Sequence, residues 1–342
     1  DLQDMRAERH LELTLVANPD LDLEVDGAAS QRSEFRWLEP EGDFCRSVPV
    51  GIPSGFRYFL DGTQRTLPAF FSAFVPIIAT INAAAILVRS DDGDCAIMPG
   101  MLRLRHHWLA PRRSGDPAVD RVIATVERQP HATGGGAEPP VIPCVIDPIQ
   151  HLEGSAYQAA LEDFSRLVYL AYDKARKLRQ ELEEDLLHDW WKATSGAADW
   201  IVVDGALRIA QPRMVGLVKS FTRHYLTGEA ASALLRLPRG HRSPAFEVYD
   251  RWWRGTPVTA WYLRLRDATG RDPRYGLIRV ETSPEVRDTT QIDEVSSWIL
   301  AERIPSATAD ARWATLLYPV HFLEQILKRY LEAETRGWPS PR

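Results

Sequence analysis

The stretch RYFLDGTQRTL, residues 57–67, decides how the rest of the chain is interpreted, because an apolar run leads into Asp61 and Gly62 follows at once. The arrangement returns in DWIVVDGALRIA, residues 199–210, where three apolar residues lead into Asp204 and a second glycine. A charge at the end of a buried strand must be paired or hydrated. Each Asp-Gly pair taken alone is typical of a turn that ends a strand. Two such pairs in one chain also fit a shared site, so both interpretations are kept.

Composition predicts a soluble globular protein. The 342 residues are 44% apolar and 26% charged, which suits one large elaborated domain or two. The formal net charge of −6 gives no overall basic surface for nucleic acid, although arginines are dense in RLRHHWLAPRR, residues 103–113. Three widely spaced cysteines without a CxxC pair argue against a disulfide scaffold or a zinc site and for a reducing compartment. Because the charged N-terminus resembles no signal peptide, we expect a cytoplasmic protein.

One segment is long enough to cross a membrane. Residues 67–88 carry no formal charge, and that length suffices for a bilayer-spanning helix. Two prolines and Asn82 disfavour such a helix, and no second span or basic flank accompanies it. We therefore expect two buried strands, at 69–75 and 77–88, after a strand that ends at Asp61.

The remaining pattern predicts an α/β chain. Residues 1–50 are polar and irregular, and residues 110–142 are typical of a loop because they contain the breaker TGGGAEPP. Apolar residues recur at steps of three and four across 155–192, which predicts one long helix. The other predicted elements are a candidate strand at 11–16, the strand into Asp204, strands at 214–221, 258–266 and 275–282, and a final helix over 316–334.

The order of these elements suggests why the two aspartates recur. Asp61 and Asp204 converge if their strands are neighbours in one sheet. Carboxylates about 4–6 Å apart repel each other unless a cation neutralises them. Mg²⁺ and Mn²⁺ prefer oxygen ligands and, in paired sites, activate water for phosphodiester cleavage. A glycine behind each aspartate would let backbone or a substrate phosphate approach closely.

Six short blocks in order resemble the NurA nuclease family over about residues 57–330. They are FLDGTQ, VVDGAL, VGLVKSF, WYLRLR, GLIRVET and LLYPVHFLEQIL. The resemblance implies an α/β fold with an RNase H-like mixed sheet flanked by helices, in a domain covering 51–342 that follows an N-terminal extension over 1–50 and carries an insertion at about 110–150. It implies a divalent-metal nuclease acting on DNA ends, with Mn²⁺ or Mg²⁺ as cofactor. The implied partners are a second copy of the chain and a HerA-like hexameric translocase, in DNA end processing or phage defence and away from the membrane.

The metal ligands follow from the same resemblance. Asp61 matches the first-strand ligand of the family, and Asp204 matches the later one. The helix glutamate of the family falls in LRQELEEDLL, where the spacing favours Glu183. Glu181 and Glu184 are its rivals, since an acidic run of this kind is also typical of a solvated helix face.

Other polar residues have two interpretations each. Lys219 suits a phosphate-facing cation or a strand-end ion pair. His321 resembles the C-terminal metal-site or general-acid position of the family, or is a core histidine. Asp147 ends another apolar run and is either an unexpected ligand or part of a turn that begins at a proline. Arg264 and Arg279, on predicted strands, contact phosphate or are simply exposed.

Together these features predict a metal-dependent deoxyribonuclease. Asp61, Glu183 and Asp204 would hold one or two ions, while Lys219 would steer phosphate. The alternative from another class is a non-catalytic RNase H-like module that scaffolds a translocase, and a degenerate helix glutamate would favour it. An Argonaute-like nuclease is disfavoured, because the chain shows no obvious room for guide-binding domains. The negative net charge predicts weak DNA binding by the isolated protein.

Overall fold

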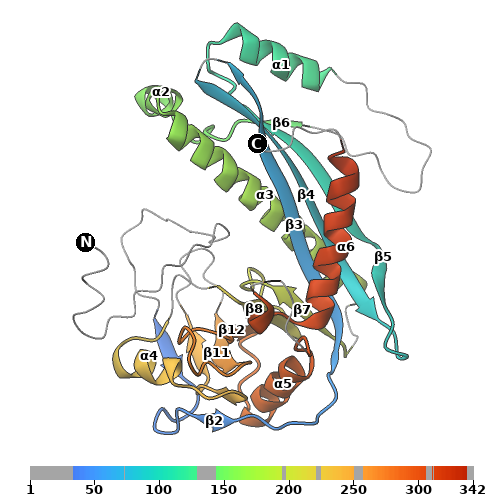
Figure 1. The fold of residues 1–342 in the computed structure, drawn as a ribbon, viewed down its shortest axis with the longest axis vertical. Coiled ribbons are helices and arrows are strands. Elements are labelled where there is room, and N and C mark those ends of the chain that lie inside the picture. Colours follow the sequence, from blue (N-terminus) through green and yellow to red (C-terminus); the bar gives the residue numbers. More distant parts are fainter. Residues whose placement is uncertain are drawn as a thin grey trace.

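The computed structural model describes residues 34–72, 74–128, 144–194, 198–220, 225–249, 257–305, 310 and 312–336. These residues form one large mixed β-sheet that carries helices on both of its faces (Figure 1). The candidate strand at 11–16 and the breaker TGGGAEPP lie outside the described residues.

Ten strands make up the main path of the sheet. They are β1 (Phe35–Trp37), β3 (Phe56–Ser72), β4 (Val75–Arg89), β5 (Cys95–Leu109), β6 (Cys144–Ile146), β7 (Trp200–Asp204), β8 (Met214–Val218), β10 (Phe246–Val248), β11 (Val258–Arg264) and β12 (Leu277–Thr282). Their order is β1-β10-β11-β12-β8-β7-β3-β4-β5-β6. Antiparallel pairing joins β3 to β4 and β4 to β5, whereas β7 runs parallel to both β3 and β8. The predicted strands within 214–221, 258–266 and 275–282 are thereby confirmed.

The sequence suggested that the first strand would end at Asp61, but β3 continues past this residue. Asp61 pairs with Ala85, and the β3–β4 ladder continues to the pair of Ser72 with Val75. The polar residues after Asp61 remain extended because β4 supplies their backbone hydrogen-bond partners. The expected strand at 69–75 is therefore mainly the end of β3, and the one at 77–88 is β4. No helix within the described ranges is long and apolar enough to cross a membrane.

The described helices confirm one prediction from the sequence and correct two others. Those described are α1 (Pro117–Glu127), α2 (Gly154–Glu162), α3 (Phe164–Ala193), α4 (Gly228–Leu235), α5 (Thr289–Ala301) and α6 (Tyr318–Glu334). The final helix is confirmed as α6. Two helices, α2 and α3, replace the single helix expected over 155–192, because Asp163 between them has an extended backbone conformation. The Asp163 side chain caps α3 by accepting a hydrogen bond from the N–H of Arg166. The segment expected to be a loop contains α1, which Asp116 caps and Pro117 begins.

Alternation along β3 divides the core into two layers. Phe59 packs with residues of α5 and α6 on one face of the sheet, whereas Leu60 packs with Leu182 and Leu186 of α3 on the other. Figure 1 shows α3 and α6 crossing the long β3–β4–β5 ribbon. Burying one such large apolar side chain contributes about 1.5–3 kcal/mol. The two helices are thus fixed against opposite faces of the strand that carries Asp61.

The polar N-terminal segment joins the sheet from residue 35 onward. β1 pairs with β10, and the short strands β2 (Arg46–Ser47) and β9 (His241–Arg242) pair off the main path. Glu39 lies between β1 and β2 in the chain, and its buried carboxylate accepts a hydrogen bond from Arg242 of β9. The Nη1 atom of Arg242 lies 2.6 Å from Oε2 of Glu39. This buried ion pair ties the segment to the central sheet.

Candidate active site

Asp61 and Asp204 lie on neighbouring parallel strands. Leu60 pairs with Val203 in the register of β3 and β7, and each aspartate is the next residue along its strand. β7 ends at Asp204 while β3 continues, so beyond this point β4 is the one described strand beside β3. The two strands are therefore neighbours, as the predicted site requires, and past the two carboxylates β3 keeps β4 as its one described partner strand.

Asp61 is a buried carboxylate that forms no ion pair with any described residue. Its exposed fraction is 6%, and no lysine, arginine or histidine nitrogen of the described chain lies within 4.0 Å of it. Burial and the charge of Asp204 raise the pKa of Asp61 well above its usual value, although Lys219 opposes this shift. The charges of Glu183 and Glu324 raise this pKa further. Asp61 therefore lies in an environment that a bound cation would stabilise.

Lys219 and Asp204 form an ion pair at the edge of this site. Lys219 directly follows β8, and its Nζ lies 2.7 Å from Oδ2 of Asp204. Both side chains are partly exposed, with 12% and 23% of their surface accessible. The strand-end ion pair proposed for Lys219 is therefore present, and it places a positive charge within electrostatic reach of Asp61.

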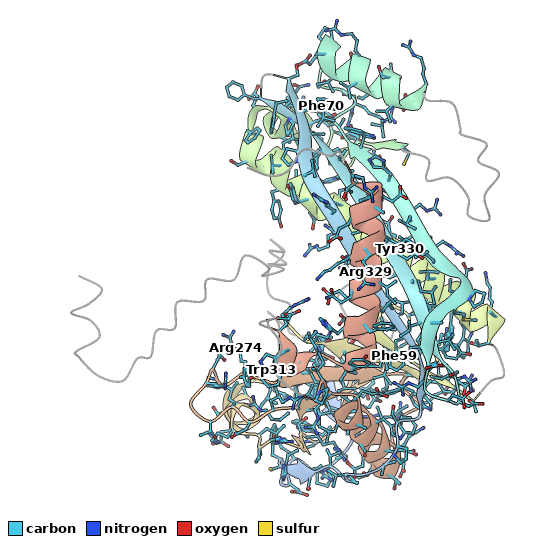
Figure 2. All side chains as sticks on the ribbon, turned by 45° about the vertical axis from the view of Figure 1, so that its right-hand side comes forward. Phe59, Phe70, Arg274, Trp313, Arg329 and Tyr330 are labelled. Carbon is cyan, nitrogen blue, oxygen red and sulfur yellow. The ribbon has the colours of Figure 1, made fainter. Side chains whose placement is uncertain are left out.

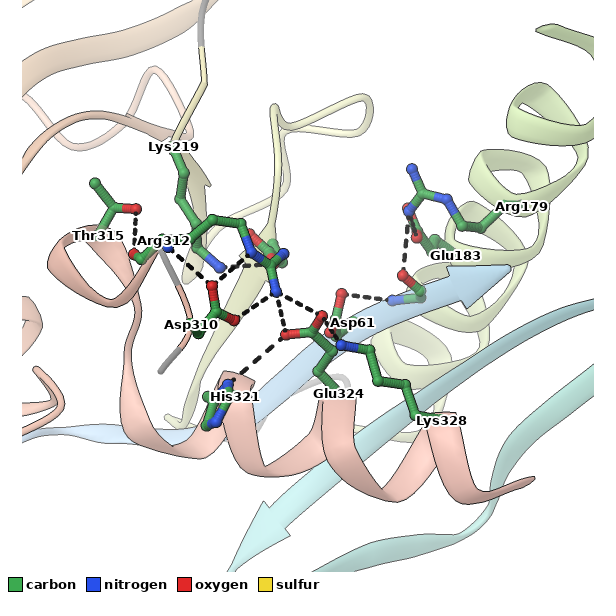
Figure 3. A network of polar contacts seen from close by, with 12 residues as sticks. Asp61, Arg179, Glu183, Lys219, Asp310, Arg312, Thr315, His321, Glu324 and Lys328 are labelled. Carbon is green, nitrogen blue, oxygen red and sulfur yellow. Dashed lines mark hydrogen bonds and ion pairs between the residues drawn. The ribbon is translucent and has the colours of Figure 1, made fainter. Parts of the chain in front are cut away.

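Glu183 approaches the site from α3. Its carboxylate lies against Gly62, where an added Cβ would stand only 2.8 Å from its Cδ. Arg179, one turn earlier on α3, pairs with this carboxylate and also contacts the carbonyl oxygen of Gly62 at 3.4 Å. Burial raises the pKa of Glu183, and the charge of Asp204 adds to that effect while Arg179 opposes it. Figure 3 shows Glu183 and its partner Arg179 on α3, close to the part of β3 that carries Asp61.

The glycines behind the two aspartates have different roles. Gly62 makes room for Glu183 and donates its N–H to Oδ1 of Asp61 at 2.8 Å. Gly205 has φ +125°, a conformation that residues with a side chain rarely adopt. Gly62 therefore provides space for a close approach, whereas Gly205 forms a turn. Each of the two interpretations of an Asp-Gly pair thus applies to one of the two glycines.

The rival glutamates of α3 point elsewhere. Glu181 is exposed and lies 3.7 Å from Lys174, while Glu184 pairs with Arg208 at 3.2 Å. Of the three candidates, Glu183 alone lies against the strand that carries Asp61. The geometry thus favours Glu183, the glutamate that the spacing of the family motif also favoured.

His321 belongs to a separate cluster on and beside α6. Ligand atoms of Asp310, His321 and Glu324 lie within 4.8 Å of one another, the one such group of three among the described residues. Arg312 Nη2 lies 2.8 Å from both Oδ2 of Asp310 and Oε1 of Glu324, and Lys328 Nζ lies 2.9 Å from the latter. Two carboxylates are thus balanced by two cations (Figure 3). We therefore assign no metal to this group.

Glu324 is the residue of this cluster that affects Asp61. Burial alone would raise the pKa of Glu324, but hydrogen bonds from Arg312 and Lys328 lower it overall, so the carboxylate stays charged. Its charge in turn raises the pKa of Asp61. His321 Nδ1 is buried and lies 3.8 Å from Oε2 of Glu324, too far for a hydrogen bond. The sequence pattern of Glu324 and Lys328 showed only an ordinary helix pair, and the predicted site did not include Glu324.

The exposed face of α6 carries a stacked aromatic pair. Tyr318 and Phe322 are 56% and 37% exposed, with ring centroids 6.4 Å apart and ring planes 6° from parallel. His321 lies between them in sequence. Flat aromatic surface is therefore accessible on the helix that also carries Glu324.

Asp147 is a turn residue. Its Oδ1 accepts the N–H of Ile149 at 3.0 Å, while its Oδ2 accepts from the hydroxyl of Tyr157 at 2.9 Å and the N–H of Arg112 at 3.1 Å. These bonds satisfy the buried carboxylate locally, so the turn interpretation is supported over that of a ligand.

The strand arginines are structural, neither exposed nor free for phosphate. Arg264 is fully buried and donates to backbone carbonyls that include those of Leu237 and Tyr275. Arg279 is 5% exposed and pairs with Glu281 at 3.0 Å.

Most of the arginine-dense segment is also engaged within the chain. Arg103 pairs with Asp189, Arg112 pairs with Glu127, and Arg113 lies over the ring of Tyr157. These contacts reduce the positive charge that the segment can offer to DNA.

Comparison with known proteins identifies no family. No family model matches the chain, and no curated protein matches its sequence. The chemistry of the site therefore carries the functional inference.

Proposed function

We propose that the protein is a divalent-metal-dependent deoxyribonuclease with an RNase H-like core, similar to the NurA nucleases. The observation that carries the proposal is Asp61, which is 6% exposed and has no cationic partner within 4.0 Å in the described chain. Asp204 follows the same register on the adjoining parallel strand. Two such carboxylates repel each other unless a cation lies between them.

The central strands support the RNase H-like assignment. Three antiparallel strands, β3, β4 and β5, follow one another in the chain, and the long helix α3 packs on them. Two further strands follow, with β7 parallel to β3 and β8 parallel to β7. This succession brings the first and fourth of the five strands together at Asp61 and Asp204.

The carboxylates of Asp61, Asp204 and Glu183 are of the donor type that a hard divalent cation prefers, although their ligand atoms do not all lie within 4.8 Å of one another in this structure. Asp61, Asp204 and Glu183 would hold Mn²⁺ or Mg²⁺, which prefer oxygen ligands. When bound, such ions supply an activated water and stabilise the leaving oxygen of a phosphodiester. Lys219 orients Asp204 and adds a positive charge next to Asp61, where a phosphate group would be held. Arg179 orients Glu183 in the same way.

Several features support DNA as the substrate and a translocase as the partner. The stacked pair Tyr318 and Phe322 offers an exposed surface for an unpaired base. The net charge of −6 predicts weak binding to DNA by the nuclease alone. A HerA-like hexameric ATPase that threads DNA would raise its local concentration at a cytoplasmic NurA-type homodimer.

The second candidate function is a catalytically inactive scaffold of a translocase complex. It is favoured by the ion pairs of Asp204 with Lys219 and of Glu183 with Arg179, which already neutralise two of the three carboxylates. On this alternative the same surface would bind a translocase without cutting DNA.

A cleavage assay separates the two functions. Linear duplex and single-stranded DNA would be incubated with the protein in Mn²⁺, Mg²⁺ or EDTA, with and without a HerA-like translocase. We expect metal-dependent cleavage that Asp61→Asn abolishes and Glu181→Gln, at an exposed position on α3, leaves intact. Cleavage in EDTA would refute the metal dependence, and equal cleavage by Asp61→Asn would refute the assignment of the active site. A protein that binds the translocase but cuts no DNA in any metal would support the scaffold.

A further inference from the structure

Arg213 has a backbone conformation that does not suit its side chain. It follows Pro212 in the turn before β8 and has φ +63°, the one positive value at a non-glycine residue in the described ranges. This conformation favours glycine or asparagine at such a turn position. Its carbonyl oxygen accepts the N–H of Ile201, which fixes the turn beside the start of β7. Backbone strain of this kind is often found at functional sites, which makes Arg213 a candidate ligand-binding residue.

The guanidinium of Arg213 has no anionic partner among the residues that the structure describes. Its Nε is buried and makes no hydrogen bond, and no carboxylate of the described chain lies within 4.0 Å of its nitrogens. The contact recorded for the group is with the ring of Trp191, whose centroid lies 5.9 Å away. Most other partly buried arginines among the described residues, such as Arg89 and Arg208, pair with carboxylates. A partly buried cation without a counterion is unfavourable unless something else supplies negative charge.

A pocket of about 250 Å³ lies at this position. It is lined by Trp200, Pro212, Arg213, Ser283, Glu285, Val286 and Gln291. Trp200 begins β7 and Asp204 ends it, so the pocket is about 13 Å along the strand from the candidate active site. It is a separate feature of the fold.

We propose that this pocket binds a small oxyanion, either a phosphate or a carboxylate group. The planar guanidinium of Arg213 matches the two oxygens of such a group and would pair with them bidentately. Ser283 is 2% exposed, and its Oγ accepts the N–H of Glu285 at 3.4 Å, which leaves the hydroxyl proton to donate. Gln291 supplies an amide donor. The pocket is smaller than most sites for drug-sized ligands, which are about 300–1,000 Å³, so a small anion or a single charged group of a larger molecule is the expected occupant.

Glu285 gives the proposal a second, independent test. This glutamate lines the pocket but is exposed to solvent, so it weakens the positive potential without closing the site. Removing its charge should strengthen binding of an anion, whereas it should weaken binding of a cation or of a zwitterion that contacts both Arg213 and Glu285.

The test measures two effects of substituting Arg213, namely the change in melting temperature and the change in anion affinity. Inorganic phosphate and acetate would each be titrated at constant ionic strength against a chloride control, with melting temperature and calorimetric affinity as readouts. We expect at least one anion to bind and to raise the Tm of the wild type. Arg213→Gly should melt no lower than the wild type in chloride, because glycine accepts the positive φ, yet should bind the anion at least tenfold more weakly. Glu285→Gln should bind it more tightly.

The control is Arg329→Ala, which removes an exposed arginine of α6 (labelled in Figure 2) that does not line the pocket and should bind the anion as the wild type does. Binding of phosphate alone would identify a phosphate site, and equal binding of acetate would extend it to carboxylates. The proposal is overturned if neither anion binds, if Arg213→Gly binds as tightly as the wild type, or if Arg213→Gly melts several degrees lower in chloride. The last result would mean that the guanidinium supports the fold and not a ligand. None of these outcomes depends on nuclease activity.

Discussion

The carboxylate of Glu183 on α3 lies directly against Gly62 on β3, so a side chain at residue 62 would occupy the same space. Glycine is therefore required for Glu183 to come this close to the strand of Asp61. The neighbouring backbone is ordinary extended strand, because Gly62 pairs with Ala84.

Replacing Gly62 by alanine should consequently move Glu183 and leave the fold in place. The atoms that would clash belong to a side chain, and alanine suits a strand better than glycine by roughly 0.5–1 kcal/mol. We expect at least a tenfold loss of cleavage rate with a Tm close to the wild type. Gly42→Ala is the matched control, since nothing lies within 4 Å of the added Cβ there. Normal activity of Gly62→Ala would mean that Glu183 is not needed where it lies.

Asp61→Asn and Asp204→Asn should each abolish metal-dependent cleavage. Asp61→Asn should also raise the stability of the metal-free protein, because it removes a buried carboxylate that the charge of Asp204 repels. Urea unfolding in EDTA and in Mn²⁺ would measure both effects, and the stabilisation by Mn²⁺ should be lost in the mutant. A mutant that still gains stability from Mn²⁺ would show that the ion binds elsewhere.

The three helix glutamates should differ sharply when changed one at a time to glutamine. Only Glu183→Gln should remove activity, since Glu181 and Glu184 form ion pairs away from Asp61. Initial cleavage rates of the three variants at saturating Mn²⁺ provide the comparison. Three fully active variants would leave α3 without a ligand.

We expect the free energy of unfolding to fall in mild acid because of the buried, neutral His107. Burial, together with the positive charges of His106, Arg105 and Lys174, lowers the pKa of His107 from 6.5 to about 4. Between these two values the unfolded chain binds a proton that the folded chain does not, so stability is lost as the pH falls from 6.5 towards 4. The loss reaches at most about 3 kcal/mol.

His107→Leu, of similar size, should remove that part of the pH dependence. Urea unfolding at pH 7 and pH 4.5 would measure the difference, with His151→Gln as the exposed control. Equal pH dependence in the wild type and in His107→Leu would show that the neutral imidazole contributes nothing to it.

The partner prediction concerns the intact assembly. We expect a homodimer that binds a HerA-like hexamer and digests DNA at least tenfold faster within that complex, because the ring supplies the DNA affinity that a net charge of −6 does not. Sedimentation of the protein alone and with the translocase, followed by time courses of digestion, would measure both. A monomer that digests duplex ends equally fast without the ATPase would contradict the prediction.

Local sequence determined most of the central elements. The apolar run before Asp204, the alternation in β11 and β12 and the three-and-four spacing in α6 and in the long part of α3 are patterns within a few residues, and each formed the expected element. The sequence predicted that Asp61 and Asp204 would meet only if their strands were neighbours, and the parallel pairing of β3 with β7 meets that condition. The preference for Glu183 rested on family spacing and agrees with the geometry at Gly62.

Tertiary structure decided what local patterns do not encode. β3 continues past Asp61 because β4 offers backbone partners, although Asp-Gly commonly ends a strand. Arg264 is buried because carbonyls from the loop after α4 converge on it, and Glu324 affects Asp61 although more than 250 residues separate them. Strand continuation, burial of a charge and the pKa of a carboxylate all depend on groups brought together only by folding. The sequence by itself therefore determined which residues could form the site, whereas packing across the sheet decided which of them meet.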